Sequence, residues 1–183
     1  MAQFGLLTGI VYSEAKVGLA DVTVTVGSKS TTTDQYGNFI LSGLTPAANA
    51  LANFAKAGYI GNQKTVKIET GKTTFVHNAM LTTGISMNFS SDTETVVQEN
   101  WMSEVAIPAN AFKKPDGSAF TGVVRAEVRY FDPTQQASLD AFPGDFAGVQ
   151  TNGDEVMFES YGFISASFYD ANDPATNLQL AAG

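Results

Sequence analysis

The feature that most constrains this chain is the alternation of apolar and polar residues in short runs separated by turn residues. The stretch D-V-T-V-T-V at residues 21–26 is the clearest case, because valine occupies every second position. Gly27 and Ser28 follow it at once, and similar turn signals return about every eight to twelve residues. Side chains of a strand point alternately to opposite faces, so each run predicts a strand with one buried face.

Runs of this kind fill the chain up to residue 82, and the pattern resumes after residues 82–84. The strands expected in the first half are residues 5–12, 21–26, 29–33, 39–41, 50–55, 63–68 and 74–81. Those expected in the second half are residues 85–89, 95–98, 101–107, 122–131, 155–159, 161–169 and 177–181, with one short helix within residues 133–142. The sequence therefore predicts an all-β fold of two tandem antiparallel β-sandwiches, at residues 1–82 and 84–183.

The charge changes at the same boundary. Residues 1–82 contain six Lys, two Asp and two Glu, a net charge of +2, whereas residues 83–183 contain two Lys, two Arg, eight Asp and six Glu, a net charge of −10. The total of −8 repels phosphate backbones, so nucleic acid is not an expected partner. The absence of cysteine excludes disulfides, thiolate nucleophiles and cysteine-ligated metals.

Five stretches of the first half carry a resemblance to a known domain. They are G-I-V-Y at 9–12, G-L-A-D-V-T-V-T-V at 18–26, T-T-D-Q-Y-G-N-F-I-L-S-G-L at 32–44, A-G-Y at 57–59 and V-K-I-E-T-G-K-T-T-F-V at 66–76. Together they resemble the carboxypeptidase regulatory-like domain over residues 5–82, which implies a transthyretin-like sandwich. Domains of this family accompany catalytic or surface proteins and carry no reaction themselves. Residues 46–48 (P-A-A) depart from the Pro-Gly that the family often has there.

The second half resembles a different group of proteins over residues 103–170. The relevant stretches are V-A-I-P-A-N-A-F at 105–112, V-R-A-E-V-R-Y-F-D-P-T at 124–134, F-P-G-D-F at 142–146 and S-Y-G-F-I-S-A-S-F-Y-D at 160–170. They are similar to modules of bacterial surface proteins and to cartilage intermediate layer and ZU5-like proteins. In such proteins we expect sequence to continue beyond the position of Leu180. We therefore expect the acidic sandwich to be truncated at its C-terminus, with a last strand that lacks a neighbour.

The residues that could perform catalysis do not form a recognisable set. His77 is the single histidine, lies within an alternating run, and has no G-x-S-x-G or comparable nucleophile motif to act with. The acidic half contains so many carboxylates that pairs close enough for glycoside hydrolysis would occur by chance. We therefore expect His77 to be an ordinary strand residue and the protein not to be an enzyme.

Calcium is the cofactor that the acidic loops could bind. Ca²⁺ takes about six to eight oxygen ligands, which loops rich in Asp and Asn supply. The candidate ligands are Asp170, Asn172, Asp173, Asp132 and Asp145, and Asp140 and Asp154 lie in similar surroundings. No stretch matches the D-x-[DN]-x-[DN]-G loop, and D-A-N-D-P is also good turn sequence. Two interpretations stay open, a calcium site and a set of solvated turn carboxylates, and no other cofactor is expected.

Aromatic residues and strand edges offer two further binding modes. The aromatic residues that could stack on a sugar are Trp101, Tyr130, Phe131, Tyr161 and Tyr169, although a sandwich core uses the same residue types. Edge strands of a sandwich present backbone groups that can accept a partner strand. Residues 30–33 are a plausible polar edge, next to which Lys29 would discourage pairing.

These observations favour a non-catalytic, secreted or cell-surface module with a structural or adhesive role, which contacts other proteins or surface polymers. The alternatives are a carbohydrate-binding module, with or without calcium, and a subunit that self-associates by strand exchange through its edges. No apolar run reaches the roughly 18 residues that a membrane-spanning helix needs. The first residues lack the basic and apolar regions of a secretion signal, so we expect that a secreted protein of this sequence has had its signal removed.

Overall fold

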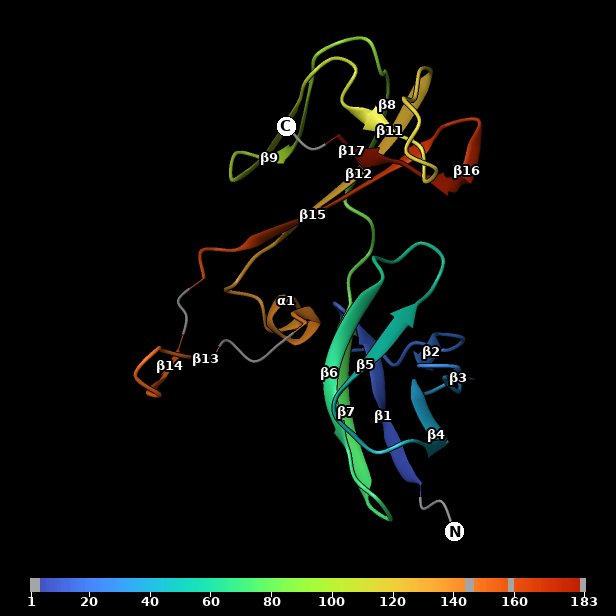
Figure 1. Ribbon diagram of the computed structural model, residues 1–183, viewed down its shortest axis with the longest axis vertical. Coiled ribbons are helices and arrows are strands. Elements are labelled where there is room, and N and C mark those ends of the chain that lie inside the picture. Colours follow the sequence, from blue (N-terminus) through green and yellow to red (C-terminus); the bar gives the residue numbers. More distant parts are fainter. Residues whose placement is uncertain (1–3, 144–146, 158–159, 182–183) are drawn as a thin grey trace. The chain divides into compact units, whose positions relative to one another are not determined.

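The computed structural model describes residues 4–143, 147–157 and 160–181, and almost every ordered element in it is a strand (Figure 1). The prediction of an all-β fold is confirmed. The chain forms two compact units. Unit 1 contains Met1–Thr82 and Asp132–Tyr161, and unit 2 contains Thr83–Phe131 and Gly162–Gly183. No helix among the described residues is long and apolar enough to cross a membrane.

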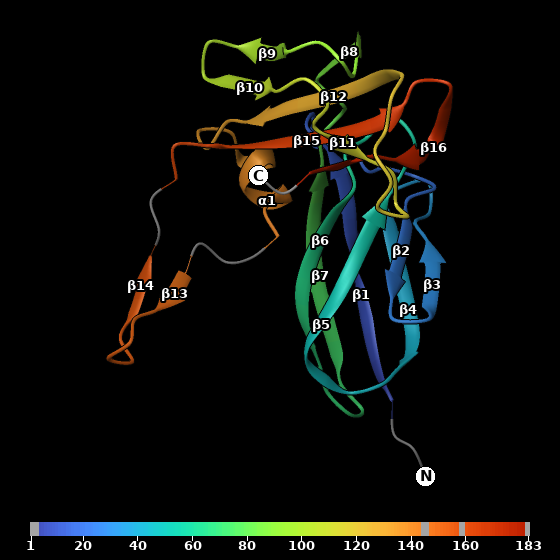
Figure 2. The ribbon, with the colours of Figure 1, turned by 45° about the horizontal axis from the view of Figure 1, so that its top comes forward.

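Unit 1 is built on two facing sheets (Figure 2). The three-stranded sheet has the order β4-β1-β7, with β1 at Gly5–Ser13, β4 at Asn38–Leu44 and β7 at Thr73–Met80. The four-stranded sheet has the order β3-β2-β5-β6, with β2 at Thr23–Val26, β3 at Lys29–Thr32, β5 at Ala47–Ala55 and β6 at Asn62–Ile68. These strands correspond one to one with the seven runs expected from the sequence.

One strand pair corrects the predicted antiparallel arrangement. β1 pairs with β4 in antiparallel fashion but with β7 in parallel, from Leu6 opposite Thr73 to Ser13 opposite Met80. The direction of β7 is set by the tight turn after β6, in which the Lys72 N–H donates to the Glu69 carbonyl. β6 belongs to the other sheet, so the chain crosses the sandwich between β6 and β7. β7 then runs beside β1 in the same direction as β1.

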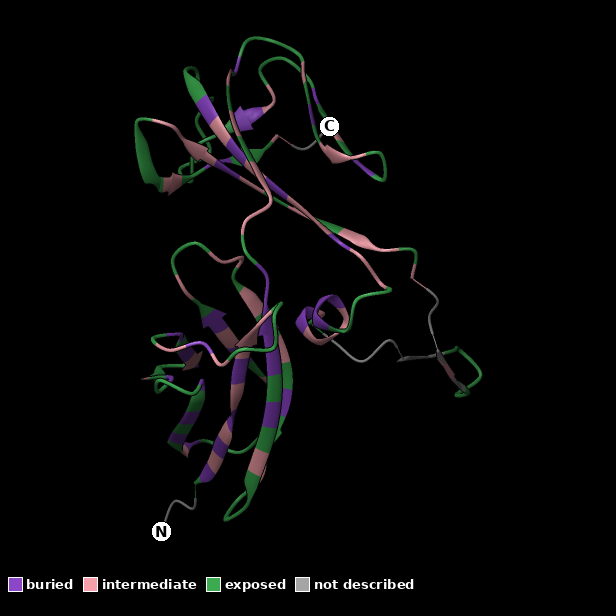
Figure 3. Cartoon of the chain, turned by 180° about the vertical axis from the view of Figure 1, so that it is seen from behind, coloured by how far each residue is buried: buried purple, intermediate pink, exposed green. Residues whose placement is uncertain are grey.

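The core of unit 1 follows from the alternation seen in the sequence (Figure 3). Val22, just before β2, and Val24 and Val26 within it are all buried. Thr23, between Val22 and Val24, is exposed. Phe39 of β4 and Phe54 of β5 meet edge to face, with ring centroids 6.0 Å apart, and so join the two sheets. Each fully buried side chain of this size contributes about 1.5–3 kcal/mol to folding.

The turn between β3 and β4 depends on Asp34 and Gly37. One carboxylate oxygen of Asp34 accepts from the backbone N–H groups of Tyr36 and Asn38, both at 2.9 Å, and the Gly37 N–H donates to the Asp34 carbonyl. Gly37 has a φ of 83°, which a residue without a Cβ adopts at no steric cost. The sequence D-Q-Y-G-N at 34–38 predicts this turn, with Asp34 as its cap and Gly37 at positive φ, and the structure confirms it.

The segment Asp132–Tyr161 groups with the first 82 residues, so the two units differ from the two consecutive segments expected, 1–82 and 84–183. It contains helix α1 at Gln136–Ala141 and the hairpin of β13 (Ala147–Val149) with β14 (Glu155–Met157). The predicted short helix is confirmed, and its buried residues are Ala137, Ser138 and Ala141. The net charges of the two compact units therefore differ from those of the two sequence halves.

Polar contacts connect this segment to the sandwich of unit 1. The Tyr12 hydroxyl of β1 donates to the Asp140 carboxylate of α1. At the end of α1, the Asn62 side chain donates to the Ala141 carbonyl at 3.3 Å, and Lys64 donates to the Phe142 carbonyl. Burial, followed by the hydrogen bond to Asp140, raises the pKa of Tyr12. Hydrogen bonds to two backbone carbonyls and one carboxylate therefore connect α1 and the residue after it to β1 and β6.

Unit 2 has a four-stranded sheet over two short strand pairs. The sheet has the order β16-β15-β12-β8, with β8 at Ile85–Ser90, β12 at Val123–Phe131, β15 at Phe163–Asp170 and β16 at Asp173–Asn177. The pairs are β9 (Thr95–Asn100) with β10 (Ser103–Ile107), and β11 (Phe112–Lys113) with β17 (Gln179–Leu180).

One core lies between the sheet of unit 2 and these pairs. Phe112 of β11 and Phe168 of β15 lie with ring centroids 5.2 Å apart, against the buried face of β12. Because β17 pairs with β11, placing Leu180 opposite Phe112, the prediction that the last strand lacks a neighbour is wrong. The apolar Leu178 next to it is buried in the same core.

Substitution of Gly37 tests the turn after β3. A Cβ at this position would lie 2.1 Å from the Val11 carbonyl oxygen and would force a side chain into positive φ. We expect Gly37→Ala to lower the free energy of unfolding by about 3 kcal/mol. Gly27→Ala is the matched control, since Gly27 has a φ of 57° but no atom within 4 Å of the new Cβ. It should cost about 1 kcal/mol in urea denaturation, and equal losses for the two variants would contradict this account.

Substitution of Tyr12 tests the attachment of α1. Tyr12→Phe removes a hydrogen bond to a carboxylate, so we expect a loss of about 1–2 kcal/mol and faster hydrogen exchange in α1. In the double-mutant cycle, Tyr12→Phe and Asp140→Asn should be non-additive because the two side chains share one interaction. Additive losses would show that the hydroxyl and the carboxylate act independently.

Candidate functional site

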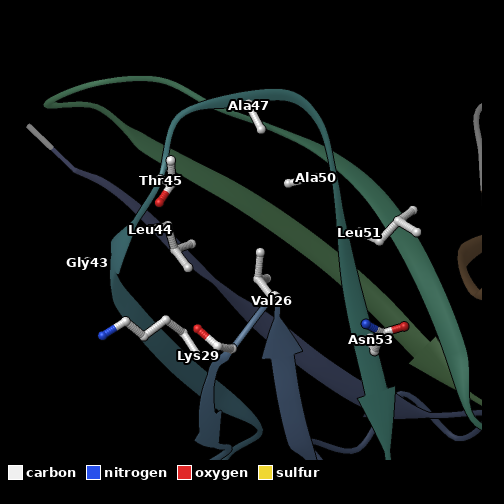
Figure 4. A pocket seen from close by; sticks show the side chains of 11 residues that line it. Val26, Lys29, Gly43, Leu44, Thr45, Ala47, Ala50, Leu51 and Asn53 are labelled. Carbon is white, nitrogen blue, oxygen red and sulfur yellow. The ribbon is translucent and has the colours of Figure 1, made fainter.

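A cavity of about 620 Å³ opens at one end of the sandwich of unit 1 (Figure 4). Three segments surround it: the tip of the β2–β3 hairpin at residues 26–29, the end of β4 at residues 43–45, and the first part of β5. From β5 the lining residues are Ala47, Ala50, Leu51 and Asn53. The cavity therefore lies where the chain passes from one sheet to the other, between β4 and β5.

The cavity exists because β2 is shorter than β5. β2 pairs with β5 only as far as Val26, which lies opposite Ala52. β5 begins five positions earlier, and its early residues Ala47, Ala50 and Leu51 pair with β6 on the other side. On the β2 side, no strand of the described chain pairs with this part of β5. We call it the open edge of β5, residues 47–51.

The lining of the cavity is mostly apolar. Leu44 and Val26 are buried and belong to the core, whereas Leu51 is 50% exposed. Lys29 is the charged residue among the lining residues, and its side chain is exposed at the hairpin tip. Its amine can pair with an acidic group of a ligand.

A second, smaller cavity of about 380 Å³ lies at the opposite end of the β2–β5 pairing. Its lining residues are Asp21, Thr23, Ala55, Lys56, Ala57, Tyr59 and Gly61. Asp21 has a φ of 55°, and its N–H donates to the Thr33 carbonyl, so it serves the turn before β2. The charged residues that line this cavity, Asp21 and Lys56, lie in loops, and we assign the cavity no role.

The outer face of the three-stranded sheet exposes apolar side chains. Ile40 of β4 lies opposite Thr8 of β1, and Thr8 lies opposite Phe75 of β7, so the three side chains form one row across the sheet. Ile40 is 65% exposed and Phe75 is 57% exposed. Leu6 and Ile10, on the same face of β1, are half-buried. We call Ile40, Thr8 and Phe75 the outer apolar row.

His77 lies in β7, as predicted, on the face of the outer apolar row. It is exposed, and its ring centroid is 4.8 Å from that of Phe75 in an edge-to-face contact. Its contact is therefore with an aromatic side chain of the same strand.

The predicted calcium ligands are divided between the units. Asp170, Asn172 and Asp173 lie around the β15–β16 turn of unit 2, whereas Asp132 belongs to unit 1. Asp145 lies outside the described residues. The Asp170 carboxylate accepts from the Asn172 N–H at 2.9 Å, and Asp173 accepts from the Thr176 hydroxyl at 2.7 Å. These are bonds within one turn.

Asp132 forms a similar local structure after β12. Its carboxylate accepts from the Thr134 hydroxyl at 2.7 Å and from the Thr134 N–H at 2.9 Å. These two bonds, the hydroxyl first, lower the pKa of Asp132. Within the described residues, no group of three or more His, Asp or Glu side chains is placed to hold a metal ion. Calcium binding stays a prediction.

The aromatic residues considered as a sugar platform have different surroundings. Trp101 is 86% exposed at the β9–β10 turn of unit 2, and Tyr161 is 83% exposed but belongs to unit 1. Phe131 is buried and stacks on Phe163 with ring centroids 4.2 Å apart. Tyr130 and Tyr169 are half-buried, on opposite faces of the sheet of unit 2. Phe131 is thus a packing residue, and Trp101 is the freely exposed ring of unit 2.

The strand-edge prediction is confirmed in its location, because β3 is the end strand of its sheet and is largely exposed. Sequence reasoning missed the open edge of β5. A signal was present: Gly27 ends β2 after four residues, while the run of β5 extends over nine. The outer apolar row was also missed, because it depends on which strands are neighbours.

No family model matches the chain. Cartilage intermediate layer protein 1 of Mus musculus is 33% identical over 88 residues, and cartilage intermediate layer protein 2 of Homo sapiens is 30% identical over 82 residues. The matches cover 48% and 45% of this chain and 7% of each relative. The chain is therefore similar to small parts of these proteins, which are among the groups that the sequence resembles.

Two solved structures are also similar. The Bacillus anthracis TIE protein aligns with 98% of this chain and 49% of its own, at a TM-score of 0.39 and 12% identity. A type II cohesin–X-dockerin complex from Acetivibrio cellulolyticus aligns with 45% of this chain and 61% of its own, at a TM-score of 0.39 and 16% identity. These scores are too low to assign a shared fold.

Substitution of Thr134 tests the turn at Asp132. A carboxyl with a lowered pKa adds stability above its unfolded pKa of about 3.9 and loses it as the pH falls through the folded value. Thr134→Val removes the hydroxyl donor, so we expect lower stability than the wild type at neutral pH and a difference that narrows on acidification. Urea midpoints at several pH values measure this. Thr65→Val, at an exposed position of β6, should show no such narrowing, and a pH-independent difference for Thr134→Val would contradict the assignment.

Proposed function

We propose that this chain is a non-catalytic, extracellular or cell-surface structural module that makes protein–protein contacts through the sheet faces and edges of its sandwiches. The observation that carries the proposal is the outer apolar row, in which Ile40 and Phe75 are both more than half exposed and lie on either side of Thr8. The row lies on unit 1 alone, so the proposal concerns that unit first.

The row is unusual for a sheet face in contact with water. An antiparallel sheet with one solvated face normally places polar side chains outward, and isolated exposed apolar residues need no explanation. Here Ile40 and Phe75 flank Thr8, whose hydroxyl donates to the Phe39 carbonyl at 2.8 Å. Leu6 and Ile10, on the same face of β1, are half-buried. Exposed apolar side chains that gather on one sheet face in this way favour contact with another protein.

The similarity to cartilage intermediate layer proteins supports an extracellular setting, since those relatives are named for a layer of cartilage. The resemblance of residues 5–82 to the carboxypeptidase regulatory-like domain supports a role without a reaction of its own. Both arguments concern segments of longer proteins, so the proposal covers this chain and not the activity of those relatives.

A carbohydrate-binding role is the second candidate, and the exposure of Trp101 favours it. Aromatic side chains at a loop tip can stack on a sugar ring. This role, with or without calcium, would be located in unit 2 and would not use the outer apolar row. Loss of sugar binding on Trp101→Ala, with contacts by Ile40 and Phe75 unchanged, would separate the two.

The double variant Ile40→Thr/Phe75→Thr tests the proposed contact surface. Threonine keeps the β-branched shape that strands favour and replaces the exposed apolar surface, so stability should change by less than about 1 kcal/mol. We expect the wild-type chain to self-associate weakly as its concentration rises and the double variant not to, in sedimentation velocity. Val96→Thr, at an exposed position of β9, is the matched control and should behave as the wild type. A wild-type chain that stays monomeric throughout would contradict the use of this row for contacts between copies.

A further inference from the structure

We propose that the open edge of β5 is an acceptor site for a strand: it binds a short extended peptide segment of a partner protein, which continues the line of β2 and pairs with β5. The segment has small apolar side chains facing the core and an acidic residue near Lys29. This inference rests on the proposed function and names one sheet edge as a second contact site. The open edge of β5 and the outer apolar row lie on different sheets of unit 1, so the two can be tested separately.

The geometry of the sheet supplies the first argument. β2 and β6 lie on the two sides of β5, but β2 stops at Val26 and the hairpin turns back through Gly27 and Ser28 to Lys29. From Ala52 toward its beginning, β5 therefore has β6 on one side and the cavity on the other. Figure 4 shows β2 ending at Val26 below the gap, with Leu51 and Ala50 on one side and Leu44 on the other. A strand collinear with β2 fits this gap.

The chemistry of the edge supplies the second argument. A strand backbone has N–H and C=O groups on both sides, and those on the side without a neighbour are left to water. An extended peptide matches them with alternating donors and acceptors, which few other ligands do. Because partner residues of paired strands stand one to one, the open edge accommodates about five residues. A β-bulge between Ala47 and Ala50 interrupts the regular register, so the firmest pairing should centre on Ala50 and Leu51.

The side chains around the gap define the segment. Alternation directs every second side chain of an added strand toward the core, where Leu44 is 2% exposed and Val26 is 9% exposed. Ala47 and Ala50 are small, so they leave room for valine or alanine and do not fill the cavity themselves. At the hairpin end, the exposed Lys29 lines the cavity. An acidic residue at that end of the segment complements it.

A strand that continues β2 runs antiparallel to β5, so its first residue lies at the hairpin end, near Lys29. The test uses a defined probe, the N-acetylated and C-amidated peptide Glu-Val-Ala-Val-Ala, added to the complete chain labelled with ¹⁵N. We expect backbone amide shifts at residues 26–29 and 43–52 and slower hydrogen exchange along the open edge of β5. The peptide Glu-Val-Pro-Val-Ala lacks a central N–H and should bind at least tenfold more weakly, because proline removes one ladder bond. Equal binding of both peptides, or shifts confined to other surfaces, would overturn the proposal.

Variants separate this site from the proposed function. Lys29→Glu should weaken the acidic peptide about fivefold, and Lys-Val-Ala-Val-Ala should then bind better than Glu-Val-Ala-Val-Ala. Lys56→Glu makes the same charge change outside the cavity and should leave binding unchanged. Ile40→Thr/Phe75→Thr should also bind the peptide as the wild type does. Peptide binding that depends on Ile40 and Phe75 but not on Lys29 would place the interaction on the outer apolar row and refute the acceptor site.

Discussion

Unit 1 depends on the double pairing of β1. This strand holds β4 on one side and β7 on the other, and the three-stranded sheet consists of these two ladders. Gly9 lies in the middle of β1, where a Cβ would come within 2.1 Å of the Val76 carbonyl oxygen. The close approach of β1 and β7 therefore requires a residue without a side chain at this position.

The pairing of β1 also determines the surfaces that we interpret functionally. Because β1 brings β4 and β7 to its two sides, Ile40 and Phe75 come together on the outer face although they are far apart in sequence. The cavity arises in the other sheet, from the unequal lengths of β2 and β5. Both surfaces result from strand pairing, so both would be lost together if the sandwich unfolded.

Much of the fold could be predicted from local sequence, because strands and turns are local features. The alternation of Val22, Val24 and Val26, the Asp34–Gly37 turn and the helix within residues 133–142 all appear where the sequence indicates them. The candidate site was less accessible. Asp132 and Asp170 looked like members of one acidic set, yet they belong to different units. Phe131 looked like a ligand platform and is a buried packing residue, since aromatic composition does not state which face is covered.

The sequence by itself determined most of the strands, the buried face of the clearly alternating ones and turns such as Asp34–Gly37, because periodicity, β propensity and glycine placement act over a few residues. It did not indicate the short strands β11, β13 and β16. Tertiary structure alone decided which strands are neighbours, that β1 and β7 run in parallel, and that the segment Asp132–Tyr161 belongs with the first 82 residues. These outcomes depend on side chains that meet across long stretches of chain, such as Tyr12 with Asp140. The open edge of β5 is of the same kind, since a strand is an edge only in relation to its neighbours.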